Sequence, residues 1–263
     1  MKTLKSITVK ITIAIVIITS LNSCEGWDLK GIKGEGPIVS EQVQISDVEG
    51  IILEIPATVF LTQGDEQGIR IDAQQNILDN MFKSNDNGVF RLSFDKNVSR
   101  SEPIKVYMTI ASLSEIDLRG SGEVVADTKF TTEGSLYINI SGSGNVDVDA
   151  DATDVDLNIS GSGEIRLKSA CVSIDGSISG SGDIILNGSS NQSDFNISGS
   201  GSISAYNFST KICDVNTAGS GDAKVNVSDN LIVRIAGSGN VYYIGNPSIN
   251  VNIAGSGSVI NAN

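Results

Sequence analysis

The sequence contains no histidine, only four prolines and only three cysteines among its 263 residues. Without histidine, the chain has no Ser-His or Cys-His nucleophile system, no imidazole general base and no His-ligated zinc site. Basic residues are also few, because 18 Lys and Arg stand against 31 Asp and Glu and give a formal net charge of −13. A negatively charged surface repels phosphate backbones, so we expect no nucleic-acid partner.

The composition is nevertheless that of a folded protein. Hydrophobic residues make up 40% of the chain, and glycine is abundant at 28 residues. This is not the composition of a disordered segment, which has few apolar residues.

The first 23 residues have the pattern of a secretory signal peptide. Three lysines precede an apolar run over residues 11–18, which is shorter than the roughly 20 residues that a membrane-spanning helix needs. The run leads to Leu21-Asn22-Ser23-Cys24, which resembles the lipobox of bacterial lipoproteins. We therefore expect cleavage before Cys24 and acylation of Cys24; the alternative is an ordinary secretory signal with an incidental cysteine.

Residues 24–40 contain four glycines among mixed charges, a composition typical of a flexible tether. The acidic protein that follows would not adhere to an anionic membrane by charge. We expect membrane attachment through the lipid anchor only, because more than one acyl chain is what makes such anchoring stable.

The strongest signal in the sequence is a repeated Gly-Ser-Gly triplet, with copies 18 to 22 residues apart. The first glycines of the eight copies are Gly120, Gly142, Gly161, Gly180, Gly199, Gly219, Gly237 and Gly255. Between copies, apolar and polar residues alternate with the period of two of a half-buried strand. Each repeat is predicted to be one strand, a glycine corner and a second strand, since glycine permits the positive φ of a sharp turn.

Aligning the copies on their first glycine gives columns of equivalent residues. The residues two, four and six positions before the glycine are mostly apolar and are predicted to face inward. The column three positions before it is polar: Asn139, Asn158, Ser177, Asn196, Asn216, Arg234 and Asn252. The column five positions before it contains Asp156, Asp175, Asp194 and Asp214.

A unit of this size cannot bury its own apolar face, but copies stacked on one another form a continuous core, as in a solenoid. We predict an all-β fold, a single-stranded parallel β-helix over residues 120–263, with right-handed winding favoured. Seven intervals of about 4.8 Å make a column about 34 Å tall. Residues 41–119 alternate less regularly and are predicted to form an N-terminal β part that caps the column, with a short helix over residues 76–82.

These motifs resemble a known family, the bacterial auto-transporter adhesins that carry a head GIN domain. The resemblance rests on Val59-Phe60-Leu61-Thr62-Gln63-Gly64-Asp65, on the serial Ile-Ser-Gly-Ser-Gly copies and on the segment from Gly237 to Pro247. It implies a pectin-lyase-like β-helix without recognised catalytic residues. It also implies export, often with a lipid anchor at the outer membrane or cell surface of Bacteroidota-type bacteria, and a role in cell adhesion.

The polar columns offer candidate sites for a glycan or protein ligand. Amides in a row, with outward-facing tyrosines, would suit hydrogen bonding and stacking, and the candidate residues are Asn139, Asn158, Asn196, Asn216, Asn252, Tyr137 and Tyr242. The alternative is that the asparagines stabilise the stack, as repeated amides do.

The aspartate column could bind calcium, because like charges directly opposed on neighbouring strands destabilise their pairing. Solvation of Asp156, Asp175, Asp194 and Asp214 is the simpler interpretation, since open ladders seldom supply the six to eight oxygens that calcium prefers. No cofactor is expected.

Two alternatives to a non-catalytic adhesin remain open. The first is a carbohydrate-active β-helix enzyme that uses Asp156, Asp175 and Asp194 with Arg166 or Arg234, although these residues form no recognisable motif and a shared fold does not confer activity. The second is a purely structural envelope protein.

Two further expectations concern the thiols and the last coil. Cys171 and Cys213 would lie two coils apart, about 10 Å by strand spacing, which is too far for a disulfide, so both are expected to be reduced.

The last coil presents an unpaired strand edge, and weak self-association could cover it.

Overall fold

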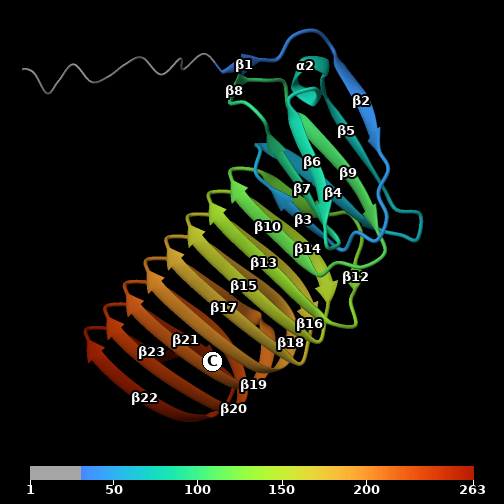
Figure 1. Cartoon of the computed structure of the whole chain (residues 1–263). Coiled ribbons are helices and arrows are strands. Elements are labelled where there is room, and N and C mark those ends of the chain that lie inside the picture. Colours follow the sequence, from blue (N-terminus) through green and yellow to red (C-terminus); the bar gives the residue numbers. More distant parts are fainter. Residues whose placement is uncertain (1–30) are drawn as a thin grey trace, which may run out of the picture.

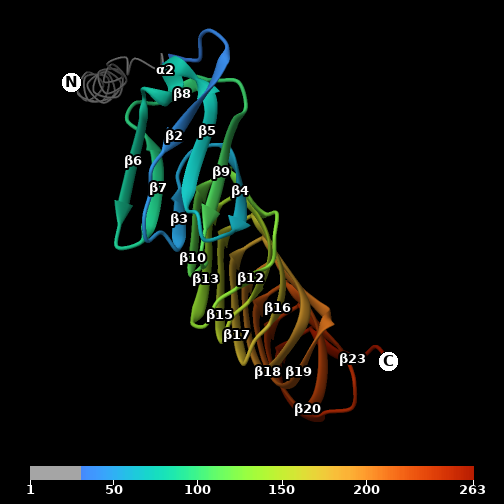
Figure 2. The ribbon, with the colours of Figure 1, turned by 90° about the vertical axis from the view of Figure 1, so that its right-hand side faces the viewer.

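The computed structural model describes residues 31–263 as an elongated molecule with an N-terminal β part at one end and a stack of coils at the other (Figures 1 and 2). The predicted lipidation site, Cys24, and the signal peptide lie outside the described residues. The stack is a parallel β-solenoid, so the predicted fold class is confirmed.

Each coil contributes strands to two parallel sheets, which we name sheet A and sheet B. Sheet A holds the strands that end at the first glycine of each corner, and sheet B holds the strands that follow the corner. In the repeat region, sheet A comprises β10 (Glu115–Gly120), β13 (Ser135–Gly142), β15 (Asp154–Gly161), β17 (Ser173–Gly180), the second halves of β18, β19 and β20, and β22 (Ser248–Gly255). Sheet B comprises β11 (Glu123–Ala126), β14 (Asn145–Asp151), β16 (Glu164–Ala170), the first halves of β18, β19 and β20, β21 (Asn240–Ile244) and β23 (Ser258–Asn261).

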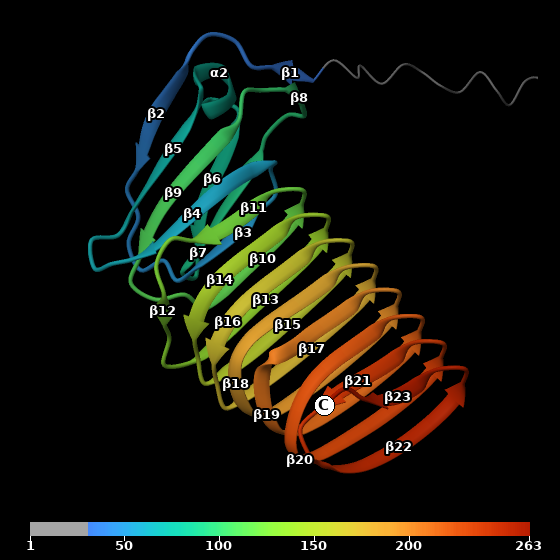
Figure 3. The same cartoon turned by 180° about the vertical axis from the view of Figure 1, so that it is seen from behind.

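Three long strands run through both sheets. They are β18 (Asp183–Gly199), β19 (Ser202–Gly219) and β20 (Asp222–Gly237), and Figure 3 shows them curving from one sheet into the other. Within sheet A the strands pair in register, so that the first glycine of each corner aligns with the first glycine of the next. The columns read from the sequence are therefore real rows of side chains across the strands.

The Gly-Ser-Gly triplets form the corners, as the sequence predicted. All eight first glycines have φ between 122° and 145°. From the second corner on, the serine N–H donates a hydrogen bond of 2.8–2.9 Å to the carbonyl oxygen of the first glycine of the preceding corner. Among residues 31–263 no hydrogen bond joins two corner serine hydroxyls, so backbone groups hold the corners together.

The core is one continuous column of apolar side chains, and the predicted inward-facing residues are buried in every coil but the last. Large and small residues alternate where a coil would otherwise be overfilled. Phe195 is buried against Gly176, its partner on the neighbouring strand, where an added Cβ would lie 3.0 Å from the Phe195 ring. A small residue in one coil thus makes room for a large residue in the next, which keeps the interior close-packed.

The N-terminal part supplies two coils of the stack as well as antiparallel strands. β3 (Gly50–Leu53) and β4 (Ala57–Gln63) pair in parallel with β10 and β11. On their other side, β3 pairs with β7 (Val89–Phe94) and β4 with β9 (Ile104–Ile110), also in parallel. The chain therefore forms the second coil before the first, an exchange of order that the repeat pattern did not predict.

Antiparallel strands complete the N-terminal end. β5 (Gly68–Gln74) pairs with β9, β2 (Ile38–Val43) pairs with β5, and β6 (Met81–Asp86) pairs with β7. Three short strands remain: β1 (Ile32–Lys33), which pairs with β8 (Val98–Arg100), and β12 (Phe130–Thr131).

The predicted helix over residues 76–82 is shorter than expected. It is α2 (Gln75–Leu78), and residues 81 and 82 belong to β6, because Met81 enters the core as a strand residue. None of the helices within residues 31–263 has the length and apolarity that crossing a membrane requires.

The corners allow a test of how much their close approach contributes to stability. At Gly180 an added Cβ would collide with the carbonyl oxygen of Gly161, whereas at Gly120 it would meet nothing within 4 Å. Both glycines have positive φ, so alanine costs about 1–3 kcal/mol of backbone strain at either position. We expect Gly180→Ala to lower the free energy of unfolding by roughly 1–3 kcal/mol more than Gly120→Ala, as measured by urea unfolding. Equal losses of unfolding free energy in the two variants would show that the close approach of the corners contributes nothing to stability.

Candidate binding groove

A groove of about 750 Å³ runs across the outer face of sheet A, from β13 to β22. Its floor is the column of residues directly before the first glycine: Ser160, Ser179, Ser198, Ala218, Ala236 and Ala254. Its edge is the polar column two residues earlier: Asn139, Asn158, Ser177, Asn196, Asn216, Arg234 and Asn252. A row of small side chains beside a row of longer amides makes the surface concave.

The groove crosses the strands and follows the axis of the stack. Register places Asn139, Asn158 and Asn196 in one row across neighbouring strands. Six strand intervals separate the first and last edge residues, which corresponds to a length of about 29 Å. The shape suits an extended ligand.

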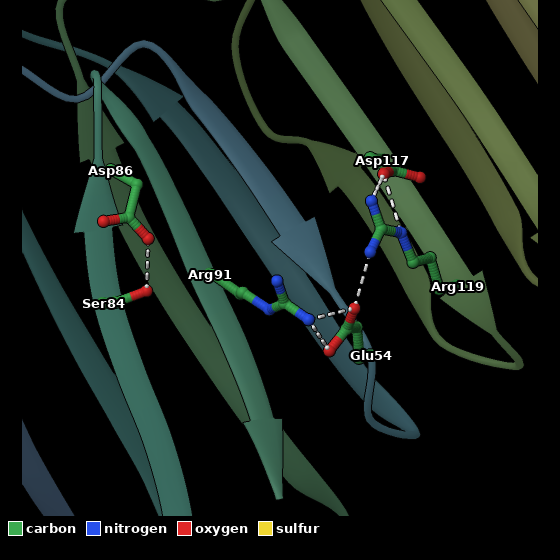
Figure 4. A network of polar contacts seen from close by, with 6 residues as sticks. All are labelled: Glu54, Ser84, Asp86, Arg91, Asp117 and Arg119. Atoms are coloured by element: carbon green, nitrogen blue, oxygen red, sulfur yellow. Dashed lines mark hydrogen bonds and ion pairs between the residues drawn. The ribbon is translucent and has the colours of Figure 1, made fainter.

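An ion-pair network lies around β10, the strand next to one end of the groove (Figure 4). In the floor column, Arg119 on β10 precedes the serines and alanines, and its Nη2 lies 2.6 Å from Asp117 Oδ2 and its Nη1 2.8 Å from Glu54 Oε1. Arg91 Nη2 on β7 binds the same Glu54 carboxylate at 2.9 Å. The hydrogen bond that Arg119 donates to Asp117 is the main reason that the pKa of Arg119 is raised. These pairs tie the N-terminal part to the first repeat coil and hold a bulky side chain next to the groove end.

Three of the five edge asparagines are held by aspartates on their own strands, and Asn139 donates to Asp117 on the neighbouring strand at 2.8 Å. Asn158 Nδ2 donates to Asp156 Oδ1 at 2.6 Å, and the equivalent bonds from Asn196 to Asp194 and from Asn216 to Asp214 measure 2.7 and 3.2 Å. Each amide nitrogen therefore points away from the floor. Hydrogen bonding runs mainly within a coil and not from one asparagine to the next, which differs from the amide stacking that the sequence suggested as an alternative.

Asp175 is the exception in the aspartate column. Ser177 occupies the position where neighbouring coils place asparagine, so the amide partner is missing. Asp175 also lies opposite Asp156 on one side and Asp194 on the other. Burial raises the pKa of Asp175, and the charges of Asp194 and Asp156 raise it further.

The calcium site suggested by the aspartate column has no support in the geometry. Within residues 31–263, no group of three or more acidic or cysteine side chains is arranged to hold a metal ion. The aspartates form a row, and three of them already accept hydrogen bonds from asparagine.

The two candidate tyrosines do not line the groove. Tyr137 is 53% exposed on sheet A but lies in the aspartate column. Tyr242 lies on β21 in sheet B, where it faces outward beside Lys224, and Tyr243 faces inward, as predicted. Five of the seven predicted ligand residues, all asparagines, come together in the groove; the two tyrosines do not join them.

The basic residues of the enzyme alternative are also separated. Arg166 lies on sheet B and binds Glu164, with a distance of 2.7 Å from its Nη2 to Glu164 Oε1. Arg234 is in the groove edge and binds both oxygens of Asp214 at 2.7 and 2.9 Å. Arg166 is therefore not available to an acid on sheet A.

Both thiols in the repeat region are free, in agreement with the sequence expectation. Cys213 is buried in the core, and burial raises its pKa strongly. Burial also raises the pKa of the half-buried Cys171 to about 11. Neither side chain is therefore a thiolate at neutral pH.

The sequence reasoning missed the groove floor. The signal was present, because the column directly before the glycine contains only serine and alanine after Arg119. We did not predict that a column of small residues beside one of amides would form a concave surface.

Comparison with known proteins connects this architecture to a family. The sequence profile of the family described as "putative auto-transporter adhesin, head GIN domain" matches residues 47–172 and 155–247. The chain belongs to this family. A search of curated proteins found no match.

Solved structures similar to this head GIN domain protein come from Bacteroidales. A "putative adhesin" from Parabacteroides merdae is 24% identical, with a TM-score of 0.85, over 88% of this chain and 99% of its own. A "putative lipid binding protein" from Parabacteroides distasonis is 25% identical, with a TM-score of 0.80 and the same coverage. A "putative adhesin" from Bacteroides fragilis is 22% identical, with a TM-score of 0.67, over 88% of this chain and all of its own. The solenoid with its N-terminal part is thus a shared fold.

The strain in the aspartate column predicts a pH-dependent effect on stability. Because the folded-state pKa of Asp175 is raised, its ionised form destabilises the fold, and this cost is absent below the ordinary carboxyl pKa of about 3.9. We expect Asp175→Asn to raise the free energy of unfolding at pH 7 by up to about 1 kcal/mol. The gain should vanish as the pH falls below about 4.

A second variant and a control complete this test. Ser177→Asn, which restores the amide of the neighbouring coils, should also stabilise the protein at pH 7 while keeping the charge of Asp175. Asp65→Asn, in an exposed loop, removes one charge far from the column. If Asp65→Asn stabilised the protein as much as Asp175→Asn does, the effect would reflect net charge alone.

Proposed function

We propose that this head GIN domain protein is a non-catalytic adhesin of the cell envelope that binds a glycan or protein ligand in the sheet A groove. The observation that supports the proposal is the groove itself, in which five asparagines and a floor of small residues form one continuous surface across the repeat coils. Family membership supports an adhesin at the cell surface or in the envelope.

The chemistry of the groove favours an uncharged glycan. Amide and hydroxyl groups both donate and accept hydrogen bonds, as sugar hydroxyls require. Arg234 is the single charged residue of the lining, and Asp214 already neutralises it. An anionic ligand would find no free positive charge among the lining residues.

Binding without turnover is supported by the state of the nearby acids. Asp156, Asp194 and Asp214 accept hydrogen bonds from the edge asparagines and lie beside the groove, not in its lining. Glycoside hydrolysis uses a pair of carboxyl groups that flank the scissile bond. The acids here occupy one row on one side of the groove.

Lipid anchoring at Cys24 would display the groove away from the membrane. The predicted tether over residues 24–40 is not free over its whole length, because β1 pairs with β8 and β2 pairs with β5 from Ile38 onward. β1, near the start of the described chain, lies at the end of the molecule opposite β22 (Figures 1 and 2). We propose the outer membrane or cell surface as the location, with the stack of coils pointing outward.

The ligand can be sought with a glycan and host-matrix protein array, and the groove can be tested by filling its floor. Ser198→Phe places a ring in the groove without entering the core, since Ser198 is exposed. We expect this variant to lose binding by tenfold or more, about 1.4 kcal/mol. Ser204→Phe, at an outward position of sheet B, is the matched control and should bind normally.

The outcomes separate the alternatives. Equal binding by both variants would place the ligand site outside the groove. Cleavage of an array polysaccharide would support the enzyme alternative, and no binding to any glycan, protein or lipid vesicle would support a structural envelope role. Vesicles are included because one structural relative is described as a lipid-binding protein.

Anchoring is tested separately in cells. Cys24→Ser should abolish incorporation of labelled palmitate and move the protein from the membrane fraction to the soluble fraction. Antibody labelling of intact cells should detect the wild-type protein if it is displayed externally. Membrane retention of Cys24→Ser would contradict the lipoprotein assignment.

A further inference from the structure

The core of the solenoid is open at its last coil. The strands of this coil, β22 and β23, are hydrogen-bonded on one side only, to β20 and β21. Ile249, Val251 and Ile253 of the inward columns are 39%, 43% and 38% exposed. Their equivalents one coil earlier, Leu231, Val233 and Ile235, are at most 2% exposed.

The side chains at this end of the molecule carry no charge. The sequence from residue 235 to residue 263 contains no Lys, Arg, Asp or Glu, whereas the whole chain has 18 basic and 31 acidic residues. Exposed strand edges are normally protected from pairing by charged side chains, proline or bulges. Neither β22 nor β23 contains a charged residue or a proline. In so acidic a protein, a neutral end is where a second copy can approach without repulsion.

The opposite end of the stack is closed to such contacts. The first coil is covered by the antiparallel strands β6 and β2–β5. Lys83 on β6 binds Glu41 on β2 at 2.8 Å and brings both charges to these edges. Head-to-tail stacking is therefore blocked, and the arrangement that remains is an isologous pair related by a two-fold axis.

The exposed strand is self-complementary in that arrangement. When two β22 strands pair antiparallel about Val251, each Val251 faces its counterpart and Ile249 of one copy faces Ile253 of the other. Inward residues then oppose inward residues, and Asn250 opposes Asn252 on the outer face. A shift by one residue would place apolar side chains opposite polar ones, so this register is the favoured one.

We propose that two copies of this protein pair tip to tip through β22 and β23, as a homophilic contact between facing surfaces. The contact between facing surfaces rests on the proposed lipid anchor. Since β1 and β22 lie at opposite ends of the molecule (Figure 1), the pair carries its two tethers at its far ends. Copies anchored on two cells meet in this geometry, whereas copies on one flat membrane do not.

The contact is tested first in solution by sedimentation equilibrium of the purified protein. Wild type should show a concentration-dependent dimer. Val251→Lys places a charge in the centre of the contact and should weaken dimerisation about tenfold or more. Ile38→Lys makes the same kind of change at an exposed residue of the other end and should leave the dimer unchanged. A wild-type protein that stays monomeric at its highest soluble concentration would overturn the proposal.

A second variant guards against loss of the last coil in Val251→Lys. Opposed residues of an antiparallel pair have Cα atoms about 4.5–5.5 Å apart, within disulfide range. In a Cys171→Ser background, Val251→Cys should therefore form a disulfide-linked dimer on oxidation. Asn230→Cys, on β20 in the preceding coil, is the control and should stay monomeric. Equal cross-linking of the two variants would overturn the register.

The cellular geometry is tested with beads that carry the protein attached through its N-terminus. Wild-type beads should cluster, and Val251→Lys beads should stay dispersed. The groove variant Ser198→Phe lies three coils away from β22 and should still cluster, so loss of the groove ligand and loss of the tip contact can be told apart. Dimerisation in solution without bead clustering would overturn the contact between facing surfaces.

Discussion

The structure depends on the alignment of its corners. The N–H of each corner serine binds the carbonyl oxygen of the glycine one corner earlier, and the glycines approach so closely that a Cβ would collide with that carbonyl from Gly142 onward. These contacts set each strand in register with the next. Because register is set, equivalent residues form straight columns, and every other feature of the repeat region follows from the composition of those columns.

The columns have opposite consequences on the two sides of sheet A. Inside, a column tolerates variation only when a neighbour compensates, as Phe195 does for Gly176. On the outer face, the same kind of residue is repeated from coil to coil, so that small residues form the floor of the groove and amides form its edge. Repeated aspartates accumulate repulsion, which the asparagines relieve in three coils but not at Asp175. The same geometry thus creates a groove and a site of electrostatic strain.

A stack of coils also has two ends, and they differ in chemistry. At the N-terminal end, antiparallel strands and the Lys83–Glu41 pair cover the first coil, and the network around Glu54 joins it to the repeat. At the other end the core is exposed and uncharged over β22 and β23. The difference makes the molecule directional, with one end capped and the core exposed at the other.

The sequence alone was sufficient to predict the solenoid, the glycine corners, the inward columns and the row of asparagines, because these depend on local alternation and on the backbone freedom of glycine. Tertiary structure decided what depends on distant strand pairing. That pairing places β3 and β4 between β10–β11 and β7–β9, sets Arg119 on the strand next to one end of the groove, and puts Tyr242 on the sheet opposite the asparagines. Local periodicity tells which way a side chain faces, but not which strand will lie beside it.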